Sequence, residues 1–99
     1  MRDLASLTAT DFEAVLGSTF EVVDAQGRAV LSLSLVRVVR HPERLGYRQP
    51  FSLHWTGPPT PILSQHAHHL THPGLGDIDI FLGPIAADAS AATYEAVFT

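Results

Sequence analysis

Apolar and polar residues alternate with a period of two along much of this chain, and this alternation is the feature that most restricts its fold. Within residues 28–40, every second position from Leu31 to Leu35 is a leucine, with serines between them. Successive side chains of a β-strand point to opposite faces, so such a segment has one apolar and one polar face. The phase changes at Val36, which predicts either a β-bulge or a length of strand buried on both faces. The segment Phe51–Trp55 repeats the alternation. We therefore expect a sheet whose apolar faces share one interior.

Turn-forming residues divide the chain into short extended segments. Asp24–Gly27, His41–Gln49 (with Pro42 and Gly46) and Pro73-Gly74 are typical of loops between neighbouring antiparallel strands. Gly83-Pro84 is expected to end a strand, and the small residues 86–92 to form a linker. The predicted strands are residues 19–23, 28–40, 51–55 (followed by Gly57-Pro58-Pro59), 62–72, 75–82 and 94–98.

One short helix is predicted near the start of the chain, at residues 8–16. Thr10 and Glu13 have the spacing of a capping box, and Gly17 is placed as a C-terminal stop. Because so short a helix does not persist alone in water, we expect it to dock onto the sheet and to plug one end of a barrel. Its apolar residues are Phe12, Val15 and Leu16.

The composition agrees with one small folded domain, expected to span residues 1–99. Of the 99 residues, 45% are hydrophobic, which is typical of a chain that folds. No cysteine is present, which excludes disulfides and thiolate metal sites. Short connections between strands favour antiparallel pairing. The predicted fold class is mainly β: a small antiparallel six-stranded barrel or sandwich with one short N-terminal helix.

The charge of the chain argues against several classes of partner. Ten acidic and six basic residues give a net charge of −4, which offers no electrostatic attraction to nucleic acid or to an anionic membrane. The arginines between positions 37 and 48 are interpreted as the solvated flank of a loop.

Residues after Met1 lack the apolar run of a secretory signal peptide, and no segment approaches the roughly 20 apolar residues of a membrane span. The expected location is the cytoplasm, or a particle assembled there.

Four histidines close together, at positions 66 to 72, are the main chemical signal in the sequence. His66 and His68 would share one face of a strand, a spacing that can hold a zinc ion. A third ligand would come from His72, Asp77 or Asp79. A metal site is therefore one hypothesis to be tested against the pairing of this strand with the next.

The expected hairpin register argues against that metal site. If residues 73–75 form the loop, the carboxylates of Asp77 and Asp79 lie on the face opposite His66 and His68. We therefore expect structural histidines, and neither a metal nor a cofactor, with a pH-sensitive contact and a metal site as alternatives. The predicted pairs are His72 with Gly76, Thr71 with Asp77, Leu70 with Ile78, His69 with Asp79, His68 with Ile80 and His66 with Leu82.

Motifs for catalysis do not stand out in the sequence. The glycines are scattered singly rather than in a phosphate-binding loop, and no serine sits in a nucleophile elbow. We therefore expect that the protein is not an enzyme, and we predict no catalytic residue.

Several motifs together resemble those of a known family. Residues 51–58 (FSLHWTGP) resemble its FSL-x-F/W-x-G-P strand, and residues 65–76 resemble its Q…L-x-H-P-x-L-G hairpin. Residues 80–84 and the ending YEAVF at 94–98 are similar to its last strands. Over nearly its whole length the chain thus resembles a small bacterial family of domains of unknown function. The resemblance implies genes located beside those of phage-tail-collar-like proteins. His72 matches the family pattern, whereas His66 and His68 depart from it, which weakens the metal hypothesis.

These observations favour a non-enzymatic binding or assembly module with a protein partner, as an accessory of a phage-tail-like particle. Arg48, Gln65 and His72 are the polar positions in or near the motifs, and we predict that they contact the partner. Two alternatives stay open: a metal-binding protein, and a carrier of a small ligand inside the barrel. The identity of the partner and self-association stay open as well. The carrier's interior would be lined by Phe51, Leu53, Trp55 and Tyr94.

Overall fold

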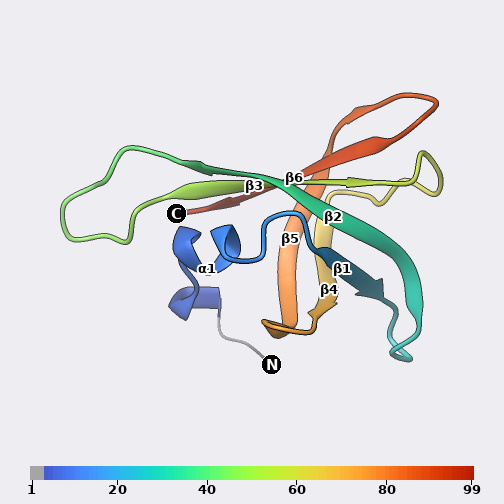
Figure 1. The fold of residues 1–99 in the computed structure, drawn as a ribbon, viewed down its shortest axis with the longest axis horizontal. Helices are drawn as coiled ribbons and strands as arrows, with labels where there is room; N and C mark the ends of the chain where they lie inside the picture. Colours follow the sequence, from blue (N-terminus) through green and yellow to red (C-terminus); the bar gives the residue numbers. More distant parts are fainter. Residues whose placement is uncertain (1–3) are drawn as a thin grey trace.

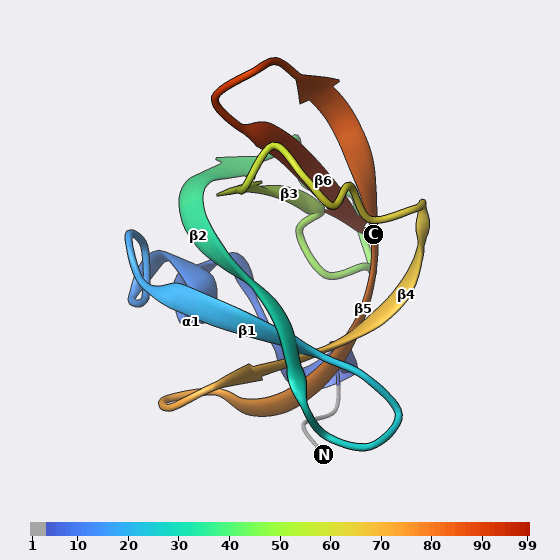
Figure 2. The same ribbon diagram turned by 90° about the vertical axis from the view of Figure 1, so that its right-hand side faces the viewer.

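Six antiparallel strands close into a barrel in the computed structural model, which describes residues 4–99 (Figures 1 and 2). Around the barrel the strands follow the order β1-β2-β3-β6-β5-β4. The predicted fold class is confirmed, and closure selects the barrel over the sandwich. The start of the chain before residue 4, where no signal peptide was predicted, lies outside the described residues. The strands are β1 (Thr19–Val23), β2 (Ala29–Arg40), β3 (Phe51–Gly57), β4 (His66–His72), β5 (Gly76–Ala87) and β6 (Ala92–Phe98).

The alternating apolar residues fill the interior of this barrel. Leu33 and Leu35 of β2 and Leu53 and Trp55 of β3 are completely buried, while Ser32 on the other face of β2 is exposed. Burial of apolar surface is the main force that stabilises such a fold. The core also contains Phe20, Val22, Leu31, Phe51, Leu70, Ile78, Ile80, Leu82, Ala92, Tyr94, Ala96 and Phe98.

Strand β2 bends so that it can pair with two different neighbours. Its first half pairs with β1 and its second half with β3, and Ser34 belongs to both ladders. The ladder with β3 slips between Leu35 and Arg37, so that Val36 is the extra residue of a bulge. Bulges bend strands and increase their twist, which a closed barrel requires. The predicted bulge is confirmed.

The prediction that Gly83-Pro84 ends a strand is wrong. β5 continues through both residues to Ala87. The pairing with β4 ends at Leu82, and from Gly83 onward β5 pairs with β6 instead. A bulge between Pro84 and Ala86 accommodates the proline, which lacks a backbone N–H for the ladder.

The predicted linker at 86–92 is shorter in the structure: Ala86 and Ala87 belong to β5 and Ala92 to β6, so only a tight turn at residues 88–91 separates the two strands. The carboxylate of Asp88 accepts hydrogen bonds from the backbone N–H groups of Ser90 and Ala91. The Ser90 hydroxyl also donates to this carboxylate, and its hydrogen bond, followed by the two backbone bonds, lowers the pKa of Asp88.

The strand predicted from residue 62 begins only at His66. Leu63 packs against the core, and its backbone N–H donates to the Tyr94 hydroxyl at 2.9 Å. This segment therefore covers the barrel instead of extending β4.

The N-terminal helix is shorter than predicted and is capped by different residues. A 3₁₀ turn (η1, Leu4–Ser6) precedes α1, which spans Ala9–Glu13. The predicted Thr10–Glu13 capping box is wrong: Thr8 is the N-cap, and its backbone N–H donates to the Asp11 carboxylate at 2.8 Å. No helix within residues 4–99 is long and apolar enough to cross a membrane.

One aromatic side chain anchors α1 to the end of the barrel where β3 begins and β6 ends. Phe12 is completely buried, with its ring 5.9 Å from Phe51 and 5.7 Å from Phe98, which stack on each other at 4.6 Å. The expectation that the helix plugs the barrel therefore holds for Phe12. It is wrong for Leu16, which is 52% exposed because α1 ends before it.

Replacing Phe12 by alanine should therefore destabilise the fold far more than replacing Leu16. We expect Phe12→Ala to lower the free energy of unfolding by about 3 to 5 kcal/mol, because it leaves a cavity beside the stacked Phe51 and Phe98 rings. Leu16→Ala serves as the control and should change stability by less than about 0.5 kcal/mol. Urea unfolding measures both, and equal losses in the two variants would contradict this docking.

Candidate functional site

The β4–β5 hairpin, which carries the histidine cluster, has the predicted register. His72 pairs with Gly76, His68 with Ile80 and His66 with Leu82, as expected. His69 lies opposite Asp79, and its Nδ1 is 2.7 Å from that carboxylate. The carboxylates thus lie on the opposite face of the hairpin from His66 and His68.

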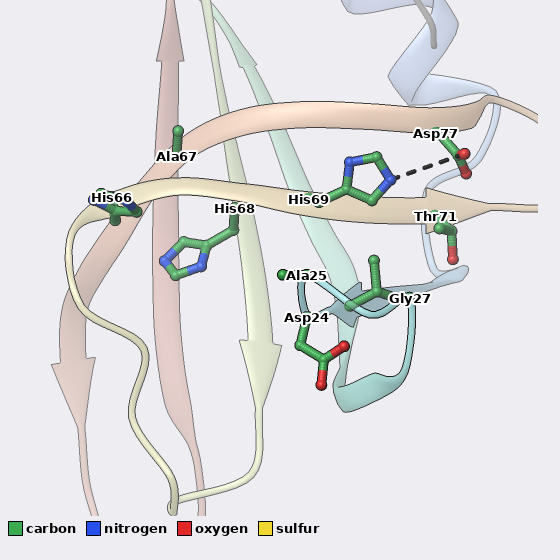
Figure 3. A pocket seen from close by; sticks show the side chains of 10 residues that line it. Asp24, Ala25, Gly27, His66, Ala67, His68, His69, Thr71 and Asp77 are labelled. Carbon is green, nitrogen blue, oxygen red and sulfur yellow. Dashed lines mark ion pairs between the residues drawn. The ribbon is translucent and has the colours of Figure 1, made fainter.

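His66 and His68 line an open groove between β4 and the β1–β2 turn (Figure 3). The groove has a volume of about 740 Å³. The two imidazole rings are 5.9 Å apart, and Nε2 of His68 donates to the Ser64 carbonyl at 2.8 Å. In Figure 3 the side chains of His68 and His69 project from opposite sides of β4.

These side chains do not assemble a metal site. Within residues 4–99, no group of three or more histidine, aspartate or glutamate side chains is placed to hold an ion. Asp77 and Asp79 both lie beside His69, at 3.8 and 2.7 Å from its ring nitrogens. The third predicted ligand, His72, is buried and engaged elsewhere. The geometry therefore offers no support for the metal-binding hypothesis.

His72 fastens the β4–β5 turn to the start of β1. Its Nδ1 accepts hydrogen bonds from the backbone N–H groups of Gly74 and Leu75, at 2.9 and 3.2 Å. Its Nε2 is 2.8 Å from the Ser18 hydroxyl, and its ring packs on Phe20 with centroids 4.5 Å apart. Burial lowers the pKa of His72, because the charged imidazolium would lose hydration there.

The Ser18–His72 pair does not have the arrangement of a catalytic dyad. Because Nδ1 accepts two N–H groups, the single ring proton of neutral His72 resides on Nε2. Nε2 therefore donates to Ser18, whose own hydroxyl proton goes to the Val15 carbonyl. A general base would have to accept the serine proton at that nitrogen.

Arg48, another predicted contact, joins the two ends of the described chain. Its Nη1 donates to the carbonyls of Leu4 and Leu7 at 2.9 and 2.7 Å, and its Nη2 to that of Thr99 at 3.3 Å. The guanidinium carbon also lies 5.7 Å from the centre of the Phe51 ring. Arg48 and His72 thus both have internal roles, and their contact with a partner stays a prediction.

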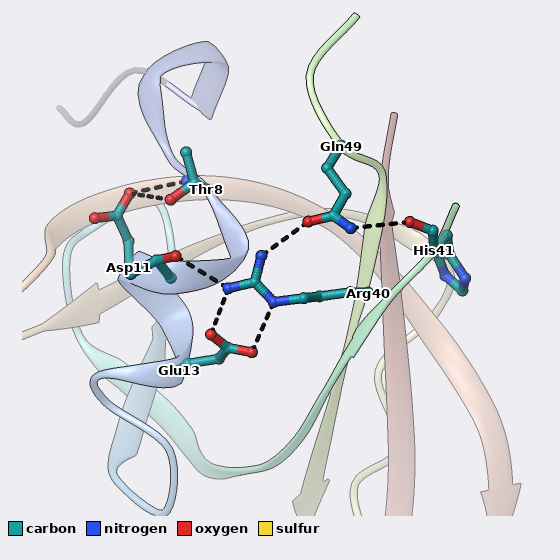
Figure 4. A network of polar contacts seen from close by, with 7 residues as sticks. Thr8, Asp11, Glu13, Arg40, His41 and Gln49 are labelled. Atoms are coloured by element: carbon teal, nitrogen blue, oxygen red, sulfur yellow. Dashed lines mark hydrogen bonds and ion pairs between the residues drawn. The ribbon is translucent and has the colours of Figure 1, made fainter. Parts of the chain in front are cut away.

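A second arginine clamps α1 to the base of the β2–β3 loop (Figure 4). Arg40 Nη2 donates to Glu13 Oε1 at 2.6 Å and to the Thr10 hydroxyl at 3.0 Å. Arg40 Nη1 donates to the Gln49 side-chain carbonyl, and the Gln49 amide donates to the backbone carbonyl of His41. The hydrogen bonds between Glu13 and Arg40 lower the pKa of Glu13 and raise the pKa of Arg40, which favours the ion pair.

The loop that Arg40 braces carries large apolar side chains into solvent. In Figure 1 the β2–β3 loop extends well beyond the barrel. At its tip, residues 44–47, Leu45 is fully exposed and Tyr47 is 70% exposed. The tip turns at Gly46, whose φ of +81° is a conformation that glycine adopts without strain. We call residues 44–47 the loop tip.

Gln65, the third predicted contact, borders a groove on the outer surface of β5 and β6. An added Cβ at Gly83 would lie only 2.8 Å from Gln65 Cβ, so the glycine gives the glutamine room to lie across β5. The groove has a volume of about 420 Å³. We call it the β5–β6 groove, and its lining residues are Gln65, Phe81, Gly83, Pro84, Ile85, Glu95 and Val97.

Three of these lining residues, missed in the sequence analysis, are large hydrophobic side chains that face solvent. Phe81 and Val97 are each 59% exposed and Ile85 is 53% exposed. A signal existed for two of them, since Phe81 and Val97 occupy outward positions of the period-two pattern, where a polar residue is usual. Phe81 and Val97 each stand between two core residues in the sequence. They therefore belong to continuous apolar runs, in which an outward-facing position is not apparent.

The interior of the barrel offers no space for the small ligand that a carrier would hold. Phe51, Leu53, Trp55 and Tyr94, the predicted lining, are all completely buried and packed in one core. Within residues 4–99, the only buried side-chain polar atom without a hydrogen-bond partner is Trp55 Nε1. None of the open grooves described above is lined by Trp55.

Comparison with protein-family models matches residues 7–98 to a domain of unknown function, DUF6916. The match agrees with the resemblance inferred from the motifs and covers nearly the same part of the chain. Neither the search of curated proteins nor the search of solved structures found a match.

Stability should depend on pH through His72. Burial lowers the pKa of His72 in the folded chain. The stability that neutral His72 contributes is therefore fully present above its unfolded pKa of about 6.5, and it is lost as the pH falls through the lower pKa of the folded state. His72→Asn keeps an oxygen that can accept the Gly74 and Leu75 N–H groups but does not titrate. Chemical unfolding at about pH 7.5 and about pH 5 should show a smaller loss of stability in the variant than in the wild type. Equal losses would contradict a neutral, buried His72.

Proposed function

The chain belongs to the DUF6916 family of domains of unknown function, and we propose that it acts as a non-enzymatic protein-binding module, an accessory of a phage-tail-like particle. The observation that carries the proposal is the placement of large apolar side chains on the outside of a barrel whose interior is already full. The phage-tail-like context comes from the motif resemblance, and assembly in the cytoplasm belongs to the same proposal.

Two surfaces support protein binding, and both differ from the usual scatter of exposed apolar residues. Single exposed residues such as Leu16 and Val30 are common on soluble proteins. In the β5–β6 groove, by contrast, three apolar side chains line one concavity. Contiguous apolar surface of this kind marks interaction sites. The loop tip adds a convex surface with a fully exposed leucine.

The state of the polar groups is consistent with binding rather than chemistry. Ser18 and His72, which form one hydroxyl–imidazole pair, and Arg48 all hold elements of the fold together. A surface formed by apolar side chains and few charges recognises a partner by shape and by exclusion of water.

The proposal is tested by affinity capture in the organism that encodes the chain, with the neighbouring genes intact. We expect wild type to recover tail-like structural proteins, identified by mass spectrometry. Leu45→Ser/Tyr47→Ser and Phe81→Ser/Val97→Ser should each recover at least about tenfold less, which corresponds to about 1.4 kcal/mol of binding free energy.

Leu16→Ser is the matched control, because Leu16 is similarly exposed but lies outside both surfaces. It should capture the same proteins as wild type. The proposal is contradicted if wild type is recovered without any bound protein. It is also contradicted if wild type, both double variants and the Leu16→Ser control capture the same proteins in equal amounts.

A further inference from the structure

The loop tip and the β5–β6 groove have complementary shapes. The tip is a convex turn that ends in Leu45 and Tyr47, and it is held out from the barrel by the Arg40 clamp (Figures 1 and 4). The groove is concave and lined by Phe81, Ile85 and Val97, with the Gln65 side chain packed over the buried Gly83. The loop tip therefore presents apolar side chains of the kind that the β5–β6 groove can bury.

Their charges are complementary as well. Arg44 lies at the tip with its guanidinium carbon 5.0 Å from the centre of the Tyr47 ring, and it forms no ion pair within residues 4–99. The only charged residue that lines the groove is Glu95. Its Oε2 is 2.9 Å from His54 Nε2, while Oε1 has no bonding partner in the described part of the chain. The loop tip thus carries an arginine beside apolar side chains. The groove carries apolar side chains beside one carboxylate oxygen that is available for an ion pair.

From this complementarity we infer that the loop tip of one copy docks into the β5–β6 groove of a second copy of the same chain. The inference rests on the proposed function and names the occupant of its two surfaces. Within one chain the contact is not made, because the loop extends away from β5 in Figure 1. Leu45 and Tyr47 enter between Phe81 and Val97, and Arg44 pairs with Glu95.

Such a contact joins two different surfaces, so it is heterologous. Each copy that uses its tip keeps a free groove, and each copy that uses its groove keeps a free tip, which leads to a ring or a linear array. A few side chains bury much less than the roughly 1,200 Å² of a stable interface, so each contact is weak. We expect a dissociation constant between about 1 μM and 1 mM, strengthened when several copies are held together.

Two blocked variants test the inference by sedimentation velocity. The tip-blocked variant is Leu45→Ser/Tyr47→Ser, and the groove-blocked variant is Val97→Arg, whose cation repels Arg44. The average mass of wild type should rise with concentration, as should that of the Leu16→Ser control. Each blocked variant alone should stay monomeric, and their mixture should form a one-to-one complex that grows no further. Thermal melts near the wild-type value confirm that the variants fold.

Wild type that stays monomeric up to about 1 mM overturns the inference, since that is the weakest contact expected. Association of the groove-blocked variant with itself also overturns it, because the contact would then join two tips. The host capture experiment separates the two proposals. Monomeric wild type that still captures tail-like proteins refutes only copy-to-copy docking, whereas association without capture refutes only the accessory function.

Discussion

Closure of the barrel over a completely filled interior is the constraint on which the other features depend. Every strand contributes one apolar face to the same core, and residues as large as Trp55 and Tyr94 leave no exposed surface there. A small barrel packed in this way cannot enclose a ligand. The partner binding that we propose therefore uses the outer surface, to which the strands project the other half of their side chains.

The elements outside the barrel place one of these outer surfaces far from the core. Phe12 anchors α1 on the stacked Phe51–Phe98 pair, and Arg48 holds the segment before α1 to the same rings. Arg40 then ties α1 to the base of the β2–β3 loop. Because these contacts are made at the base, the loop can carry exposed apolar residues without losing its position.

The candidate site was only partly predictable from residue types. Sequence reasoning selected polar positions within or near the motifs, and two of them, Arg48 and His72, bind backbone groups inside the protein. Gln65 does border a groove, but the apolar residues around it escaped notice. Whether an apolar residue such as Phe81 faces solvent depends on which strands lie against it, and the local sequence does not contain that information.

Sequence alone determined the features that depend on the phase of alternation: the six strands, the β4–β5 register and the bulge at Val36. These follow locally, because a shift by one residue would exchange the two faces of a strand. Only the tertiary structure decided that β5 continues past Gly83 and that the chain closes into a barrel with exposed apolar grooves. Those outcomes depend on a change of strand partner, which joins residues distant in sequence.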